Sequence, residues 1–121
     1  MNPDPSPEAV VQRQLDAYNA KDLEALLDCY AEDAELLEFP DRPLERGRAA
    51  LRERYRNRLA EPDLHARLVH RAVVGNRVVD HEVVTRNFPE GRGTLEVVMV
   101  YEVVAGRIAR SWSLSGAKTL L

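Results

Sequence analysis

The segment 64–88, LHARLVHRAVVGNRVVDHEVVTRNF, decides how this chain folds. Apolar and polar residues alternate along it, and β-branched residues, which favour strands, dominate its composition. Gly75-Asn76 divides the segment in the manner of a two-residue hairpin loop. The pattern therefore predicts two antiparallel strands, over Leu64–Val74 and Arg77–Phe88.

The two-residue loop also fixes which residues face each other across the hairpin. It places His70 opposite His81, with their Cβ atoms about 5 Å apart, and Arg71 opposite Asp80. The second pair is a favourable ion pair and supports the register. Because the alternating set that contains His81 carries fewer charges than the set that contains Asp80, we expect His81 to face the interior.

The remaining residues complete an α+β pattern. Alternation continues downstream in two further strands, Thr94–Val104 and Arg107–Ser115. Upstream, apolar residues recur at spacings of three and four, which predicts helices. The expected upstream elements are a helix over Pro7–Ala20 capped by Ser6, a short helix from Leu23 to Tyr30 capped by Asp22, a strand over Ala34–Phe39, and a helix from Gly47 that ends before Pro62.

The third strand shows a clear alternation, whereas the last does not. In the third we expect one set to face inward: Leu95, Val97, Met99, Tyr101 and Val103. In the last, Ser111 and Ser113 lie on one face and Trp112 and Leu114 on the other, and the pattern leaves open which face covers the core.

Length and charge limit the classes of function. The 121 residues suit a single domain over 1–121, and 45% hydrophobic residues are enough for a packed core. A net charge of -3 disfavours a dedicated nucleic-acid binder. No apolar run is long enough to span a membrane, and the polar Met1–Pro7 is unlike a secretory signal, so we expect a cytoplasmic protein. The single cysteine, Cys29, excludes an internal disulfide.

Several short motifs resemble one known superfamily. They are Ala9-Val-Val-Gln-Arg13 with Asn19-Ala20, Asp22-Leu23, Ala31-Glu-Asp-Ala-Glu35, Gly47 with Ala49-Ala-Leu-Arg52 and Tyr55, and Gly106-Arg-Ile108. The chain is similar along nearly its whole length to nuclear transport factor 2-like proteins, in particular to ketosteroid isomerases and SnoaL-like polyketide cyclases. The resemblance implies a cystatin-like cone, with three N-terminal helices packed on a curved antiparallel sheet that encloses an apolar pocket.

The resemblance also implies roles for single residues. In the isomerases a carboxylate moves a proton next to a ketone, and that position holds Glu38 here. The positions of the two acidic groups that hold the enolate oxygen carry Gln14 and Met99. Tyr55 matches an aromatic position beside the site, and His81 replaces an apolar aromatic residue.

Chemistry and pattern together give a set of candidate site residues. We assign general-base catalysis to Glu38 and hydrogen-bond donation or proton transfer to His81. Two inward histidines with Glu38 would also match a two-histidine, one-carboxylate metal site, but packed histidines are the commoner arrangement, and we expect neither metal nor cofactor. The candidate ligand-binding residues are Gln14, Tyr18, Tyr55, His70, Met99 and Tyr101.

The segment Arg42–Arg58 holds seven arginines, which raises phosphate or nucleic acid as a partner. Arg48, Arg52 and Arg56 recur every four residues, however, and no aromatic platform or glycine-rich loop accompanies them. A solvated helix face is the simpler interpretation, with no nucleic-acid and no membrane partner.

Two functional hypotheses follow. The first is an isomerase-, cyclase- or lyase-type enzyme that uses Glu38 to abstract a proton next to the carbonyl of a small apolar or cyclic substrate. The second is a non-catalytic ligand-binding or protein-interaction module of the same fold. In either case we expect a homodimer through the convex sheet face, where Val84, Val98 and Val100 are expected to be exposed.

Overall fold

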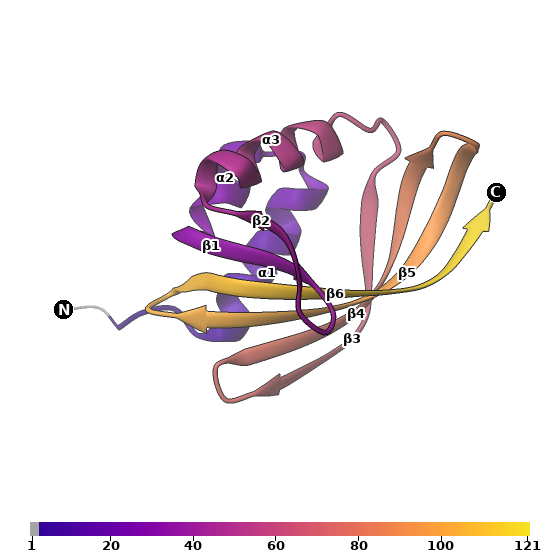
Figure 1. Cartoon of the computed structure of the whole chain (residues 1–121). Coiled ribbons are helices and arrows are strands. Elements are labelled where there is room, and N and C mark those ends of the chain that lie inside the picture. The colour runs from indigo at the N-terminus through magenta and orange to yellow at the C-terminus, as the bar shows by residue number, and fades with distance from the viewer. Residues whose placement is uncertain (1–2) are drawn as a thin grey trace.

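Three helices pack against one strongly curved sheet in the computed structural model, which describes residues 3–121 (Figure 1). Met1 and Asn2, part of the polar start considered above, lie outside the described residues. The elements are α1 (Pro7–Asn19), α2 (Leu23–Asp28), β1 (Tyr30–Glu38), β2 (Arg42–Arg46), α3 (Arg48–Leu59), β3 (His65–Val74), β4 (Arg77–Phe88), β5 (Gly91–Val104) and β6 (Arg107–Leu120). This arrangement confirms the predicted α+β class and its three helices.

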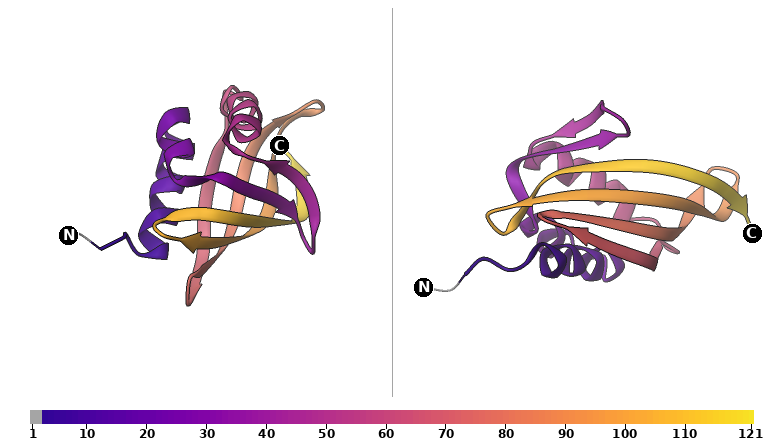
Figure 2. Two further views of the ribbon diagram at one scale, coloured as in Figure 1. Left: turned by 60° about the vertical axis from the view of Figure 1, so that its left-hand side comes forward. Right: turned by 90° about the horizontal axis from the view of Figure 1, so that it is seen from below.

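The sheet has the strand order β2-β1-β6-β5-β4-β3. Neighbouring strands are antiparallel except for β1 and β6, which run parallel. The sheet bends around the helices, with α1 against β3 to β6 and α3 against β1 and β2 (Figure 2). We call the side towards α1 and α3 the concave face and the opposite side the outer face.

The β3–β4 hairpin has the predicted register. His70 lies opposite His81, and Arg71 lies opposite Asp80. The guanidinium of Arg71 donates two hydrogen bonds to the Asp80 carboxylate, at 2.7 and 2.9 Å. A bulge between Leu68 and His70 shifts the pairing beyond that point.

The predicted facing of β4 is wrong. Val78, Asp80, Glu82 and Val84 are buried on the concave face, so His81 lies on the outer face. The charge of Asp80, which argued against burial of its set, is neutralised by Arg71. Val84, expected on the convex surface, is buried for the same reason.

The last strand buries residues from both of its alternating sets. Val103 pairs with Ile108, but Glu102 pairs with Arg110, so that Ala109 is an extra residue in a bulge. Ile108 and Ser111 are therefore both buried although an even alternation would separate them. The serines that follow continue on the concave face.

The helix starts agree with the sequence, and two later boundaries differ. The Ser6 hydroxyl accepts a hydrogen bond from the Ala9 amide at 3.1 Å, and the Asp22 carboxylate accepts one from Ala25 at 3.1 Å. Tyr30 begins β1 instead of ending α2. Strand β2 was not predicted, because Pro43 argued against a strand; β2 is an edge strand, where proline is tolerated.

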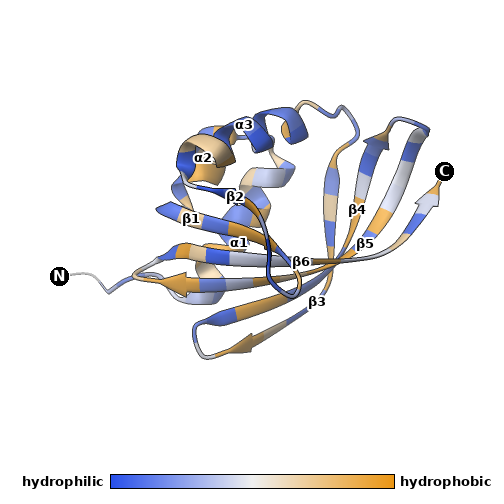
Figure 3. Cartoon of the chain, in the orientation of Figure 1, coloured by the Kyte–Doolittle hydropathy of each residue, from blue (hydrophilic) through white to orange (hydrophobic). Residues whose placement is uncertain are grey.

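The hydrophobic core lies between α1, α2 and the concave face. Its fully buried residues include Val10, Val11, Leu26, Tyr30 and Ile108. Hydrophobic and hydrophilic residues alternate along the strands (Figure 3). Among the described residues, no helix is both long and apolar enough to cross a membrane.

Candidate functional site

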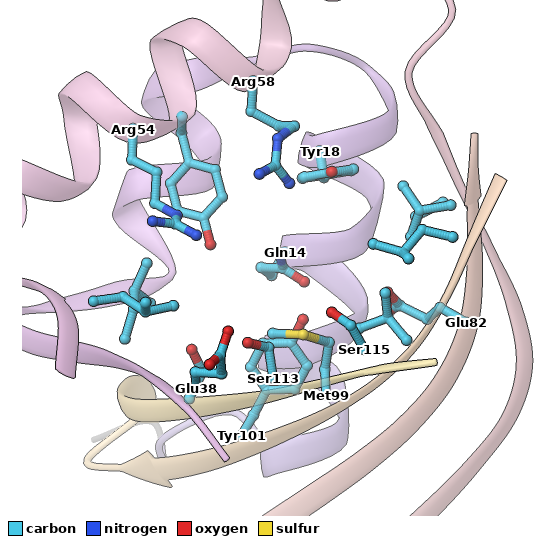
Figure 4. Close-up of a pocket in the computed structure, with 18 of the residues that line it drawn as sticks. Gln14, Tyr18, Glu38, Arg54, Arg58, Glu82, Met99, Tyr101, Ser113 and Ser115 are labelled. Carbon is cyan, nitrogen blue, oxygen red and sulfur yellow. The ribbon is translucent and has the colours of Figure 1, made fainter. Parts of the chain in front are cut away.

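A cavity of about 370 Å³ lies where the sheet curves away from α1 and α3 (Figure 4). One wall consists of side chains from the two helices, and the other of side chains from the concave face. The residues that line it are Gln14, Leu15, Tyr18, Leu36, Leu37, Glu38, Arg42, Leu44, Arg54, Tyr55, Arg58, Ala66, Glu82, Val84, Arg86, Leu95, Val97, Met99, Tyr101, Ser111, Ser113 and Ser115. The volume suits a small organic molecule, and the lining combines apolar side chains with polar and charged ones.

Three tyrosines line the cavity, Tyr18 from α1, Tyr55 from α3 and Tyr101 from β5, and Tyr30 of β1 contacts Tyr55. The hydroxyls of Tyr30 and Tyr55 are 3.1 Å apart, and the ring of Tyr18 meets that of Tyr55 edge-on at 6.5 Å between centroids. Burial raises the pKa of Tyr18 and of Tyr55, and raises that of Tyr101 well above its ordinary value. These hydroxyls are therefore neutral at physiological pH and able to donate hydrogen bonds.

Glu82 is the buried carboxylate of the cavity. Its side chain points from β4 into the site and is 5% exposed. Burial and the negative charge of Asp80 raise the pKa of Glu82 to about 7, while Arg71 acts in the opposite direction. Burial and nearby charges, and no hydrogen bond, account for this shift, and the carboxylate lines the cavity, where its oxygens can meet a ligand.

Gln14 supplies a second polar group without a protein partner. It extends from the middle of α1 towards the concave face and is 5% exposed. Its side-chain oxygen is buried and forms no hydrogen bond with any described residue. Because buried acceptors are nearly always satisfied, a ligand donor is the natural partner for this oxygen.

Glu38 occupies the mouth of the cavity, at the end of β1. Its side chain is 51% exposed, and its carboxylate accepts a hydrogen bond from Arg42 at 3.1 Å. Glu38, assigned above as the general base, thus lines the cavity at its edge. It differs from Glu82 in being solvated and paired.

The structure gathers six of the sequence candidates around one cavity: Gln14, Tyr18, Glu38, Tyr55, Met99 and Tyr101. It does not bring His70 or His81 to that cavity. His70 is exposed, and the His81 ring nitrogen lies 2.8 Å from Glu96 on the outer face. The combination of two histidines and Glu38 is therefore not formed, and the described residues contain no cluster of three or more acidic, histidine or cysteine side chains that could hold a metal.

Sequence reasoning did not include Glu82 or the four cavity arginines, Arg42, Arg54, Arg58 and Arg86, among the candidate site residues. The signal for Glu82 was present in the β4–β5 loop, which contains only Pro89 and Glu90. A two-residue loop there places Glu82 opposite Val97, which was correctly expected to face inward. Applying the hairpin argument to both loops would have turned Glu82 towards the cavity.

Comparisons with known proteins agree with this architecture. The model of the protein family described as SnoaL-like domain matches residues 11–111 of this chain. No curated protein sequence gives a match. A cystatin-fold protein from Novosphingobium aromaticivorans is 23% identical, with a TM-score of 0.84 over 91% of this chain and 98% of that one. A nuclear transport factor 2-like protein of unknown function from Cytophaga hutchinsonii is 14% identical, with a TM-score of 0.79 over 96% and 95%.

A third solved structure is similar to a comparable degree. AclR from Streptomyces galilaeus is 19% identical, with a TM-score of 0.77 over 91% of this chain and 78% of that one. At these identities the similarity establishes a shared cystatin-like fold.

Proposed function

Since the chain belongs to the SnoaL-like domain family, whose members generally bind small molecules, we propose that it is an enzyme that moves a proton next to a carbonyl group of a small, largely apolar substrate. The substrate occupies the cavity between α1, α3 and the concave face. Glu82 is the group that exchanges the proton. The observation that carries this proposal is a buried carboxylate that faces a cavity of suitable size beside apolar side chains.

Proton abstraction requires a base that is ionised and yet basic enough. A carboxylate with a pKa of about 7 meets both conditions near neutral pH. In the proposed step an oxygen of Glu82 takes the proton from the carbon beside the carbonyl. The C–H electron pair then forms the enolate, and the protonated Glu82 returns the proton to carbon or oxygen.

The enolate oxygen needs hydrogen-bond donors. Tyr101 and Tyr55 present neutral hydroxyls to the cavity, and Gln14 presents an amide. Donors held in place in a site of low water content stabilise a developing negative charge strongly. Apolar side chains, among them Leu95, Val97 and Met99, complete the lining and favour an apolar substrate body.

Glu38, which the sequence predicts as the base, is the competing carboxylate. Its side chain is half exposed and forms an ion pair with Arg42 at the cavity mouth, whereas Glu82 is buried and has no such partner. Both glutamates line the same cavity, so the two assignments are compared directly in one experiment.

Deuterium exchange tests the proton transfer without knowledge of the natural substrate. The probe is 1-indanone in D₂O, and the readout is the rate at which its C2 protons are lost from the NMR spectrum above the buffer background. We expect Glu82→Gln to lower the protein-dependent rate by about 100-fold or more, and Glu38→Gln to lower it by less than about tenfold. Glu96→Gln on the outer face is the matched control and should leave the rate unchanged.

Two results would change the assignment. Loss of exchange in Glu38→Gln with full exchange in Glu82→Gln would return the base role to Glu38. Binding of 1-indanone to the wild-type protein without accelerated exchange would favour the second hypothesis, a binding module without chemistry.

We also propose that two copies associate through the outer face of the sheet. The row formed by Val79, Val100 and Trp112 is continuous across β4, β5 and β6, and the neighbouring row contains Val98 and Leu114. Leu114 is 49% exposed. Apolar side chains on adjacent strands offer a flat, self-complementary surface of the kind found in symmetric dimers.

A further inference from the structure

Arg54 and Arg58 line the cavity from one side. They lie four residues apart on α3 and therefore on the same face of the helix. Figure 4 shows both guanidinium groups reaching from α3 into the cavity, opposite Glu38 and the serines of β6. These two arginines stand beside the apolar stripe of α3, whereas Arg52 and Arg56 pair with Glu24 and Glu53 on the helix surface.

The guanidinium of Arg58 is only loosely paired with an acidic side chain. Its nearest acidic partner is Glu61, but the two groups are 3.6 Å apart, which is too long for a hydrogen bond. The Glu61 carboxylate is already occupied. It accepts hydrogen bonds from Arg86 at 2.8, 3.1 and 2.8 Å and another from the Asn87 amide at 2.9 Å.

Arg54 is in a similar situation. Among the described residues, the acidic group within 4 Å of it is Glu45, at 3.8 Å. Neither Arg54 nor Arg58 lies within hydrogen-bond distance of its acidic neighbour among the described residues, and Arg58 also forms a side-chain hydrogen bond with Tyr18 at the cavity wall. A guanidinium carries five N–H donors in a planar fork, and two such forks on one wall of a cavity form a site for a planar anion.

The charge of the lining points in the same direction. The cavity is lined by four arginines, namely Arg42, Arg54, Arg58 and Arg86, and by two glutamates, Glu38 and Glu82. The chain as a whole has a net charge of -3. Glu38, Glu45 and Glu61 pair with these arginines, so the cavity has no large net charge, and the positive charge that faces it is local to the guanidinium groups on α3.

The two arginines lie close to the surface, so an anion bound to them would lose only part of its hydration. Arg54, Arg58 and Arg86 also border a second, shallower depression on the surface, lined mainly by polar residues. The side chains of Arg54 and Arg58 are 33% and 27% exposed. An anion held there keeps part of its hydration, while the rest of the molecule reaches the apolar inner cavity.

We propose that the substrate class is a ring-sized apolar ketone that carries a carboxylate, and that Arg54 and Arg58 bind this carboxylate. The inference rests on the proposed function, because it assigns the carbonyl end of the molecule to Glu82 and the carboxylate end to α3. The two ends of the cavity then fix the orientation of the substrate. Neither arginine takes part in the proton transfer.

A matched pair of ligands tests the anion site by calorimetry. The probes are naphthalene-2-carboxylate and its uncharged analogue naphthalene-2-carboxamide. The wild-type protein should bind the carboxylate about tenfold or more tightly than the amide, since hydrogen bonds to charged groups contribute roughly 1.5–3 kcal/mol. Arg54→Gln and Arg58→Gln should each remove most of this preference and leave binding of the amide within about twofold. Arg56→Gln, on the same helix but outside the cavity, is the control.

The possible outcomes separate this inference from the proposed function. Equal binding of the two probes by the wild-type protein, or an unchanged preference in Arg54→Gln and Arg58→Gln, would overturn the anion site and leave the apolar cavity standing. Failure of both probes to bind would overturn both. Thermal unfolding of each variant shows whether a lost preference comes from lost folding.

Discussion

Asp80 and Glu82 lie two positions apart on the concave face of β4. The charge of Asp80 is neutralised by a partner, and the charge of Glu82 is not. Asp80 is fully buried and is held by two hydrogen bonds from Arg71. Glu82 is nearly as buried but has no such partner among the described residues. One carboxylate therefore contributes to the structure of the hairpin, while the other is left with an unmatched charge.

The unmatched charge of Glu82 makes stability depend on pH. The pKa of Glu82 is raised from 4.5 to about 7 in the folded protein. Between these values the folded state keeps a proton that the unfolded chain releases, so the free energy of unfolding falls as pH rises through this window. The total loss is roughly 3 kcal/mol at most.

Substitution of Glu82 by glutamine should remove this dependence. Glu82→Gln cannot ionise, so its stability relative to the wild type should increase between pH 5 and pH 8 by about 2–3 kcal/mol. Urea unfolding at the two pH values measures the difference, with Glu96→Gln as the control. A constant difference between Glu82→Gln and the wild type would contradict the raised pKa.

At the residue scale, the success of sequence reasoning depended on how a side chain's direction is fixed. Gln14 and Tyr18, both named as ligand-binding candidates, line the cavity, because helical spacing puts them on the buried side of α1. His81 was placed wrongly because a strand offers two faces, and the choice rested on counting charges. The Arg71–Asp80 pair makes that count misleading, since a neutralised carboxylate can be buried.

At the scale of elements, Asn19 joins the end of α1 to the start of β3. Its side-chain amide donates to the Ala66 carbonyl at 2.9 Å, and its side-chain oxygen accepts from the Ala66 amide at 2.8 Å. This pair of bonds satisfies both backbone groups of one residue and fixes the distance between helix and strand. Tyr18, the residue before Asn19, and Ala66 itself line the cavity.

Asn19→Ala should therefore destabilise the protein by roughly 2 kcal/mol, because two partly buried backbone groups lose their partners. Chemical denaturation measures the change, and Asn57→Ala at an exposed position of α3 is the control. The substitution should also weaken binding of naphthalene-2-carboxylate, since it loosens one wall of the cavity. If the variant is as stable as the wild type, water replaces the two hydrogen bonds without loss of free energy of unfolding.

The sequence predicted the strand pairing of some elements but not the irregularities of others. The β3–β4 register followed from Gly75-Asn76, because a two-residue loop leaves one pairing. The bulge at Ala109 had no comparable signal, since an extra residue in a strand is favoured by its neighbours in the sheet and not by its own sequence. That bulge is what places Ser111 in the cavity lining.

At the scale of the whole molecule, the curved sheet has two faces with different environments. The concave face is covered by the helices and the cavity. The outer face carries the continuous row Val79, Val100 and Trp112 without a covering element among the described residues. Apolar rows of this kind lose contact with water when a second copy associates.

The proposed dimer can be tested by placing a charge in this row. The wild-type protein should sediment as a dimer at micromolar concentration, and Val100→Lys should sediment as a monomer, because two lysines related by the symmetry axis would be brought together without partners. Val74→Lys, at the exposed tip of the β3–β4 hairpin, is the matched control and should remain dimeric. A monomeric wild type would remove the outer face as an interface between copies, and a dimeric Val100→Lys would place the interface on another surface. The cavity opens on the opposite side of the sheet, so Val100→Lys should keep its binding of naphthalene-2-carboxylate in either case.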